Sequence, residues 1–184
     1  EWEPANGSAS PGRTSLKLEV YKNRGSLSSD LLTRQTSSFG GMTNIEYAAS
    51  ANFNNTGGDA KNDLPFILPV VKSVTKNPGI GESGTTTYNY EGGWYDIPNR
   101  EFRGFSHVQT TDPLNYTNHT YFHQDDSRLG KVERQENSIA RTFYTYKSDT
   151  SAPYFTPLIQ TDEYMDSKCR RTAYEYDDYG NIIK

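Results

Sequence analysis

Apolar and polar residues alternate with a period of two along most of the chain, between clusters of Gly, Asn, Asp and Pro. Successive side chains of a strand point to opposite faces of a sheet, so this period predicts strands. The alternation places Thr86, Tyr88 and Tyr90 together on one face, for example. No window of about 11 residues combines apolar positions at helical spacing with recognisable caps. The pattern predicts an all-β fold of antiparallel hairpins that form a twisted or curved sheet.

The segments that carry this pattern are the predicted strands. They are Leu16–Tyr21, Leu31–Thr36, Thr43–Ala48, Phe66–Lys76, Thr85–Glu91, Glu101–Thr111, Thr117–His123, Lys131–Glu136, Ile139–Lys147, Phe155–Met165 and Cys169–Tyr176. Within them the pattern Thr-x-Tyr-x-Tyr begins at Thr86, Thr142 and Thr172, without a fixed period. Such faces stabilise a sheet by about 0.2–1 kcal/mol per cross-strand pair. Chance repetition in a Tyr-rich β protein is the alternative explanation.

Gly, Asn, Asp and Pro also mark the turns and loops. Asp177–Asn181 predicts a type I turn with Gly180 in the left-handed region, which would return the chain as a hairpin. The returning strand ends at Lys184, so we expect the parent protein to continue. Residues 1–14 and 51–63 are rich in Gly, Ser, Asn or Pro and predict surface loops.

Composition favours a folded chain with little aliphatic core. The 184 residues suit one ordinary domain or two small ones. Hydrophobic residues make up 33%, against roughly 45–50% in ordinary globular domains. Disorder is the poorer explanation, because aromatic residues reach 13% and the net charge is only −4. A chain rich in Tyr and Thr suits broad sheets that are partly exposed to water.

Charge, apolar runs and cysteine use exclude several classes of protein. With 19 basic and 23 acidic residues, we expect no nucleic-acid partner. The apolar run Leu64–Val71 is short and contains two prolines, so we expect no membrane span. No signal peptide is recognisable. The single cysteine, Cys169, permits no internal disulfide and leaves the cellular compartment open.

The histidines do not predict a metal site. His119 and His123 would share a strand face about 13 Å apart, too far for two ligands of one metal. Exposed strand histidines are the simpler interpretation. Asp125 and Asp126 could bind a cation, but paired aspartates before Ser and Gly are ordinary turn chemistry.

Other candidate motifs also lack a catalytic partner. Cys169 lies among basic residues that could lower its pKa, yet a plain strand cysteine is favoured. Residues 79–84 resemble a phosphate-binding loop but lack its Lys-Ser/Thr ending and precede a strand, so a flexible loop is favoured. The alternating charges of Arg100–Arg103 indicate ion pairing at a wet surface. We therefore expect no enzyme and no cofactor.

Several stretches together resemble one family. They are DLLTRQTSSFGGMTNIEYAAS (residues 30–50), LPFILPVVKSVT (64–75), TTTYNYEGGWYDIPNREFRGFSHVQTTD (85–112), YFHQDDSRLGKV (121–132) and YEYDDYGNI (174–182). This order is similar to the middle region of the B component of bacterial Tc insecticidal toxins, and to SpvB-like and RHS (YD-repeat) proteins. The most specific residues are Gly93, Tyr95, Asp96, Arg100, Glu101, Phe102, Arg103, Gly104 and Phe105. Tyr176, Asp177, Gly180 and Asn181 resemble a single YD repeat.

The resemblance implies a non-catalytic structural role. In that family a long β-sheet forms a shell that encloses a toxic C-terminal domain, and enzymatic activity belongs to separate C-terminal domains. Residues 1–30 then form a poorly matched N-terminal segment with a first strand, and residues 31–184 a B-component region that ends within a YD-type hairpin. Implied partners are the rest of the polypeptide, its toxin domain and other toxin-complex subunits. The implied location is secreted or on the bacterial cell surface.

Two other functions remain open at this point. An extracellular binding module could recognise a glycan or receptor through Trp94 and Tyr95, if both rings lined one cleft. An enzyme would require His119, His123 and Asp125 to converge on a metal. A sheet fragment also exposes unpaired strands, so we expect self-association through its edges.

Overall fold

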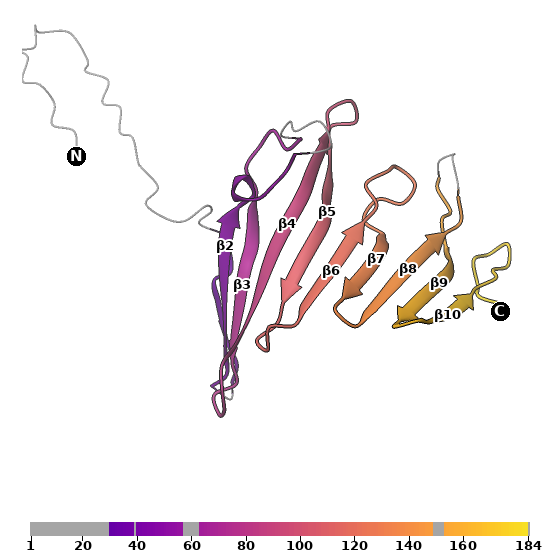
Figure 1. The fold of residues 1–184 in the computed structure, drawn as a ribbon. Helices are drawn as coiled ribbons and strands as arrows, with labels where there is room; N and C mark the ends of the chain where they lie inside the picture. Colours follow the sequence, from indigo (N-terminus) through magenta and orange to yellow (C-terminus); the bar gives the residue numbers. More distant parts are fainter. Residues whose placement is uncertain (1–29, 39, 57–62, 149–152, 184) are drawn as a thin grey trace, which may run out of the picture.

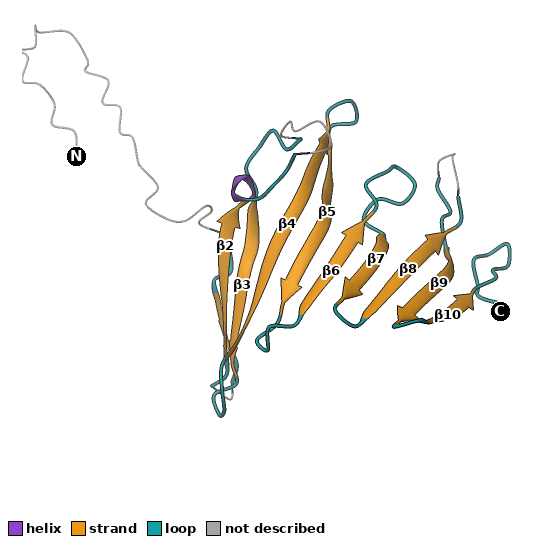
Figure 2. Ribbon diagram, viewed as in Figure 1, coloured by secondary structure: helices purple, strands orange, loops and turns teal. Residues whose placement is uncertain are grey.

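The computed structural model describes residues 30–38, 40–56, 63–148 and 153–183, which form one ten-stranded antiparallel sheet (Figures 1 and 2). Strand order in the sheet follows strand order in the sequence. The strands are β1 (Arg34–Thr36), β2 (Met42–Ala49), β3 (Pro69–Asn77), β4 (Gly84–Asp96), β5 (Glu101–Thr111), β6 (Thr117–Phe122), β7 (Val132–Asn137), β8 (Ala140–Tyr146), β9 (Leu158–Met165) and β10 (Lys168–Ala173). One short 3₁₀ helix, η1 (Ser50–Asn52), follows β2. The predicted all-β hairpin fold is confirmed.

Each predicted strand in the described part of the chain has a counterpart, but several ends differ. Leu16–Tyr21 lies outside the described residues. The largest difference is β4, which continues beyond Glu91 to Asp96. The β4–β5 register shifts between Gly93 and Tyr95, where Trp94 is opposite two residues of β5, Arg103 and Gly104, so the bulge lies on β5 and Gly104 has a positive φ of 81°. β3 begins at Pro69 and not at Phe66.

The sheet is a single layer and contains little conventional core. Figure 1 shows one twisted row of strands without a second sheet behind it. Among the described residues, the buried hydrophobic side chains are Ala48 and Leu64. The buried polar residues are more numerous: Ser50, Asn55, Ser73, Asp96, Arg103, His107, Thr156 and Thr161. Backbone ladders and paired side chains must therefore supply stability that a packed aliphatic core supplies elsewhere.

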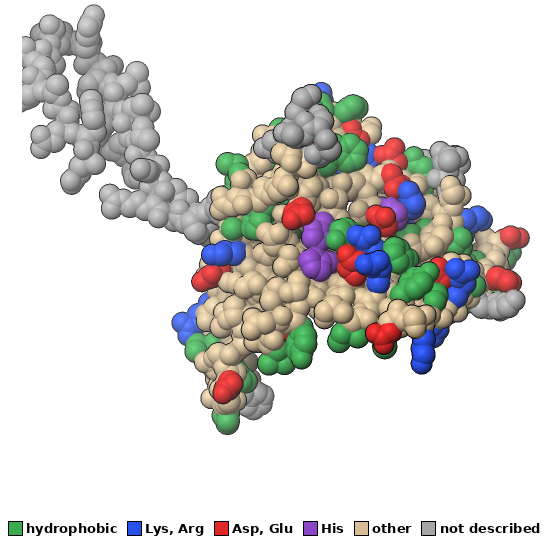
Figure 3. Space-filling view, viewed as in Figure 1, with side chains coloured by type: hydrophobic (Ala, Val, Ile, Leu, Met, Phe, Trp, Pro, Cys, Tyr) green, Lys and Arg blue, Asp and Glu red, His purple; other side chains and the backbone are tan. Residues whose placement is uncertain are grey.

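Charged residues, a histidine and aromatic residues of neighbouring strands lie in register on one face, called here the charged face. Glu91 of β4 faces His107 of β5, which faces Tyr121 of β6, which faces Arg134 of β7. The row continues through β8, β9 and β10 in the pairings Arg134–Phe143, Phe143–Asp162 and Asp162–Arg171. Figure 3 shows histidines near the middle of this face with acidic and basic side chains beside them.

The two ends of the strands differ in their connections. Short turns join β1 to β2, β3 to β4 and each later odd strand to the next. The connections 50–68, 97–100, 123–131 and 147–157 lie at the opposite end and, apart from the four-residue turn 97–100, are longer. The predicted surface loop 51–63 holds for Ala51, Asn52, Asn54 and Thr56, which are exposed, but not for Asn55. Asn54 forms a bridge with Glu91, and the Asn55 side chain is buried, donating to the Ser50 carbonyl at 2.8 Å.

The predicted turn after β10 is present. The Asp177 carboxylate accepts hydrogen bonds from the backbone N–H groups of Tyr179 and Asn181, at 2.9 and 2.8 Å. Gly180 has φ 84°, and its N–H donates to the Asp177 carbonyl. Tyr176 and Ile182 then pair as an isolated antiparallel bridge.

Candidate functional site

A buried ion pair lies where β4 and β5 meet their connecting turn. Arg103 of β5 is 5% exposed, and its Nη2 contacts Asp96 Oδ2 of β4 at 2.7 Å. The same guanidinium contacts Asp126 from the β6–β7 connection and Glu101 at 3.4 Å. The predicted ion pairing is present, but its place at a wet surface is wrong for Arg103, because the β6–β7 connection returns to cover the side chain.

The ion pair favours the charged form of both partners. Hydrogen bonds from Asn99 and then from Arg103 hold the pKa of Asp96 below its ordinary value. The hydrogen bond to Asp96 in turn raises the pKa of Arg103. A charge-assisted contact of this kind fixes two strands and one loop in a single geometry.

Next to the ion pair lies the largest group of contacting aromatic rings among the described residues. Rings from the β2–β3 connection pack on rings from β4 and β5 with centroid separations of 5.0–6.1 Å, mostly edge to face. The cluster contains Phe53, Phe66, Tyr90, Tyr95, Phe102 and Phe105. This connection thus acts as a local second layer over the single sheet.

Trp94 and Tyr95 do not form one binding platform. The Tyr95 ring packs against Phe66 at 5.1 Å within the aromatic cluster. Trp94 is 37% exposed and lies near the Arg103 guanidinium, 5.9 Å from its ring centroid. Consecutive strand residues point to opposite faces, so the two rings contact different surroundings.

The glycines of the motif permit close approach at this point. A Cβ on Gly93 would lie 2.6 Å from Asn55 Oδ1 and 2.9 Å from the Phe105 ring. A Cβ on Gly92 would lie 2.0 Å from Ser106 Oγ. Gly93 N–H donates to Asn55 Oδ1 at 3.3 Å. Because Gly93 has no side chain, the β2–β3 connection can pack directly against β4.

The longer connections also contact one another. Thr156 of the β8–β9 connection donates through Oγ1 to the Ser127 carbonyl at 2.8 Å, and Lys131 Nζ contacts the same threonine. Asp125 accepts hydrogen bonds from Ser127 and Arg128. Burial opposes its ionised form, but the hydrogen bonds from Arg128 and Ser127 outweigh burial and lower the pKa of Asp125 to about 2. Together with Arg103–Asp126, these contacts tie neighbouring hairpins at one end of the sheet.

Four hairpins share a tyrosine contact that sequence reasoning missed. Each tyrosine hydroxyl donates to a carbonyl of the preceding strand, or just before that strand in the case of Leu32, at 2.7–3.1 Å. The pairs are Tyr47 with Leu32, Tyr90 with Val71, Tyr146 with Val132 and Tyr176 with Leu158. In each hairpin the tyrosine lies three residues after the last paired residue of the ladder. We call this contact the tyrosine latch.

The β5–β6 hairpin places a glutamine at the equivalent position. Gln124 lies three residues after Tyr121, the last paired residue of β6, and its side-chain amide donates to the carbonyls of Gly104 and Gly92 at 2.9 Å. Tyr90, Tyr146 and Tyr176 are the final tyrosines of the three Thr-x-Tyr-x-Tyr copies. The repetition thus has a structural role, because it supplies donors where strands separate and carbonyls lose their ladder partners.

The histidines form a pair other than the one considered from sequence. His119 Nδ1 lies 3.0 Å from Nε2 of His107 on β5, and His107 is buried. His123 lies instead near Asp125, at 3.7 Å. Neither His119 nor His123 is fully exposed, so that prediction is wrong. Within the described ranges, no group of three or more His, Cys, Asp or Glu residues is arranged to hold a metal ion.

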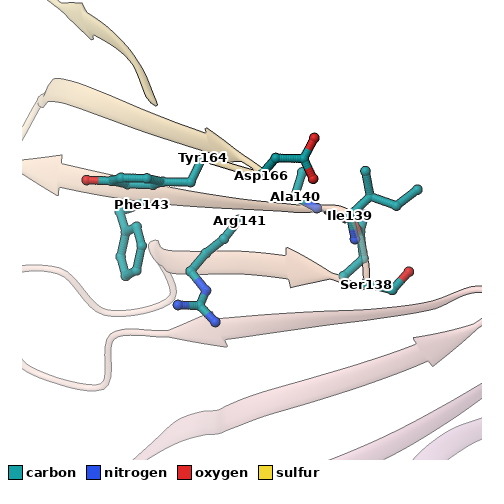
Figure 4. Close-up of a pocket in the computed structure, with 8 residues that line it drawn as sticks. Ser138, Ile139, Ala140, Arg141, Phe143, Tyr164 and Asp166 are labelled. Atoms are coloured by element: carbon teal, nitrogen blue, oxygen red, sulfur yellow. Dashed lines mark hydrogen bonds between the residues drawn. The ribbon is translucent and has the colours of Figure 1, made fainter. Parts of the chain in front are cut away.

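The surface hollows do not assemble a reactive centre. The hollow in Figure 4, about 480 Å³, lies beside the β7–β8 turn and is lined by Ile139, Arg141, Phe143, Tyr164 and Asp166 among others. Arg141 is paired with Glu136 at 2.7 Å, and Phe143 packs edge to face on Tyr164. Cys169 is an exposed free thiol on β10. Among the described residues, no helix has the length and hydropathy to cross a bilayer.

Comparison with solved structures finds the same fold within much larger proteins. The crystal structure of TcdB2-TccC3 has a TM-score of 0.61 at 14% identity, over 77% of this chain and 11% of that chain. TcdB2-TccC3 without its hypervariable C-terminal region gives 0.62 at 14% identity, with the same coverage. TcdB2-TccC3-Cdc42 gives 0.56 at 16%, over 68% and 10%. This chain therefore spans about a tenth of the length of the chains it matches.

Family comparison agrees with the structural likeness. No curated protein matches the chain. The model of the insecticide toxin TcdB middle/N-terminal region matches residues 6–133, whereas the sequence resemblance was traced from Leu31 to the C-terminus. The matched residues include β1 to β6, the buried Asp96–Arg103 pair and the aromatic cluster. The chain belongs to the TcdB middle/N-terminal region family of insecticide toxins.

Proposed function

We propose that this chain is a non-catalytic wall segment of a toxin B component, forming part of a β-sheet shell around a C-terminal toxic domain. The observation that carries the proposal is the single-layer sheet of ten consecutive strands, with Ala48 and Leu64 as the buried hydrophobics of its described part. A sheet of this kind separates two spaces without needing a core of its own. Family membership supports the same role.

The surface supports a place within a larger polypeptide. Large apolar side chains are exposed at successive turns along the short-turn end of the sheet. They are Ile80, Leu114, Tyr116, Ile139 and Met165, with exposures between 57% and 92%. A row of apolar turn tips is a surface that other protein covers. Its partners are then the rest of the same polypeptide, the enclosed toxin domain and other toxin-complex subunits, in a protein that is secreted or displayed on a bacterial surface.

The glycan- or receptor-binding alternative has less support. It required Trp94 and Tyr95 to share one cleft, and Tyr95 is engaged by Phe66. A glycan array with Trp94→Ala as the control tests it directly. Binding that is specific and depends on Trp94 would contradict a purely structural role.

Protease protection of the toxic domain tests the wall proposal. In the full-length protein, the C-terminal domain should resist limited proteolysis while the wall is intact. Gly92→Ala, which introduces a Cβ against Ser106 of β5, should increase the rate of cleavage within that domain. Tyr88→Phe is the matched control on the same strand and should leave the rate unchanged. A domain cleaved equally fast in all three proteins would refute enclosure.

A further inference from the structure

The His107–His119 contact crosses the seam between β5 and β6 in the middle of the charged face. His107 pairs with Tyr121 in the ladder and His119 with Gln109, so the two histidines are diagonal neighbours on one face. Their rings are nearly parallel, with an interplanar angle of 11°, and Nε2 of His107 lies 3.0 Å from Nδ1 of His119. One of these nitrogens must donate and the other accept, because two N–H groups cannot face each other at this distance.

The surroundings hold the His107 ring in place. Glu91 Oε2 of β4 lies 3.1 Å from His107 Nδ1. Tyr121 of β6 stacks on the His107 ring at 4.5 Å, and the Arg134 guanidinium of β7 lies 3.9 Å from the Tyr121 ring centroid. His107 can therefore hold a proton on Nδ1 toward Glu91 while its other nitrogen contacts His119.

The carboxylate that faces His119 is already shared with two arginines. Glu136 of β7 is directly opposite His119 in the ladder. Its carboxylate already contacts Arg141 of β8 at 2.7 Å, Arg134 at 3.5 Å and the Tyr121 hydroxyl at 3.2 Å. When both facing nitrogens carry a proton, the shared hydrogen bond is lost and two positive rings lie side by side on neighbouring strands.

We propose that a single proton lies between His107 Nε2 and His119 Nδ1, and that protonation of both of these nitrogens releases the β5–β6 seam. Histidine is the side chain whose charge ordinarily changes between about pH 5 and 8, so the seam is acid-sensitive. The stabilising contact is present while one of the two facing nitrogens is free to accept, and it is lost as the pH falls until both carry a proton. This inference concerns the sheet itself and does not depend on the proposed enclosure of a toxin.

Hydrogen–deuterium exchange of the full chain, corrected for intrinsic rates, measures the seam directly. Peptides from β5 and β6 report the seam, and peptides from β8 and β9 are the internal reference. Loss of a hydrogen bond that involves a charged group should raise the equilibrium constant for opening of β5–β6 about tenfold between roughly pH 7.5 and pH 5, relative to the same constant for β8–β9. An unchanged ratio in the wild-type chain would overturn the proposal without recourse to any variant.

Two substitutions separate proton sharing from simple packing. His119→Asn keeps an acceptor oxygen near the Nδ1 position and removes the second titrating ring, so it should abolish the acid response. His107→Gln keeps an amide donor near the Nε2 position and serves if the first variant does not fold. His123→Asn, outside the pair, should retain the response. An acid response of wild-type size in His119→Asn or in a folded His107→Gln would refute the proton-sharing pair.

Discussion

Arg103 illustrates how a one-layer sheet can bury a charge. Two elements supply carboxylates to its guanidinium, Asp96 from β4 and Asp126 from the β6–β7 connection. Burying a charge is costly unless it is paired and hydrogen-bonded, so the loop and the two strands must be correctly placed together. Arg103 thus connects the β4–β5 hairpin to the β6–β7 connection.

Gly92 and Gly104 offer a matched test of close packing in this motif. Both adopt positive φ, 63° and 81°, but only Gly92 has a neighbour, Ser106, where a Cβ would lie. Gly104→Ala should lower the free energy of unfolding by about 1 kcal/mol through backbone strain alone. Gly92→Ala should cost a further 1–3 kcal/mol, roughly, through overpacking. Urea denaturation measures both, and equal costs would contradict the packing argument.

Asp125 should contribute to stability against acid. Its pKa is about 2 in the folded chain, below its ordinary value of 3.8. The contribution is therefore present above about pH 4 and is lost as the pH falls toward about 2. It should stay below about 1 kcal/mol because the side chain is 40% exposed. In the wild-type chain the urea midpoint of unfolding should fall as the pH is lowered between these values. Asp125→Asn should remove this fall, whereas Ser127→Ala should reduce the slope of midpoint against pH only in part. A slope unchanged in Asp125→Asn would argue against this assignment.

At the scale of the strand pair, the tyrosine latch replaces ladder hydrogen bonds where two strands diverge. Burial raises the pKa of Tyr90 and Tyr146, which keeps both hydroxyls protonated as donors. The acceptor carbonyl lies two residues before the last paired residue of the preceding strand in all four hairpins. The latch thus recurs with one geometry despite the unequal spacing of its tyrosines.

Removing a latch hydroxyl should have a modest and local cost. Tyr90→Phe and Tyr146→Phe should each lower the free energy of unfolding by about 1 kcal/mol, because a carbonyl loses its donor while the ring still packs. Tyr88→Phe is the control, since the Tyr88 hydroxyl has no hydrogen-bond partner within the described ranges. Denaturation of the single and double variants checks the sizes and their additivity. A cost for Tyr88→Phe equal to that for Tyr90→Phe would refute the latch.

Strands could be predicted from the sequence because a period of two is a local property. Long-range contacts could not. The burial of Arg103 requires the β6–β7 connection to return to β5, and the burial of Asn55 requires the β2–β3 connection to seat on β4. The His107–His119 contact depends on the register of two strands, which neither strand specifies alone. The Thr-x-Tyr-x-Tyr copies were visible in the sequence, but only paired strands identify the carbonyls that their tyrosines reach.

At the scale of the whole molecule, two sets of contacts hold the sheet together. The backbone ladders join neighbouring strands along the sheet, and side-chain contacts join the connections at one end of the strands. The longer connections are joined by the contacts of Arg103 with Asp126 and of Ser127 and Lys131 with Thr156. The opposite end carries short turns with exposed apolar tips such as Ile80 and Ile139, and Ile67 and Ile97 are exposed at the first end. The contacts between the connections suit a wall in which one margin is held together by its own loops.

The outer edge of β10 should promote self-association. The Tyr174 N–H donates to the Ile159 carbonyl of β9, so alternation directs the Ala173 N–H to the open edge and the Thr172 N–H to β9. Ala173→Pro should therefore weaken concentration-dependent association, seen by sedimentation velocity, while retaining the fold. Thr172→Pro, one residue away, should destabilise the sheet because it removes a donor within the ladder. A wild-type chain that stays monomeric at high concentration would show that this edge does not template pairing.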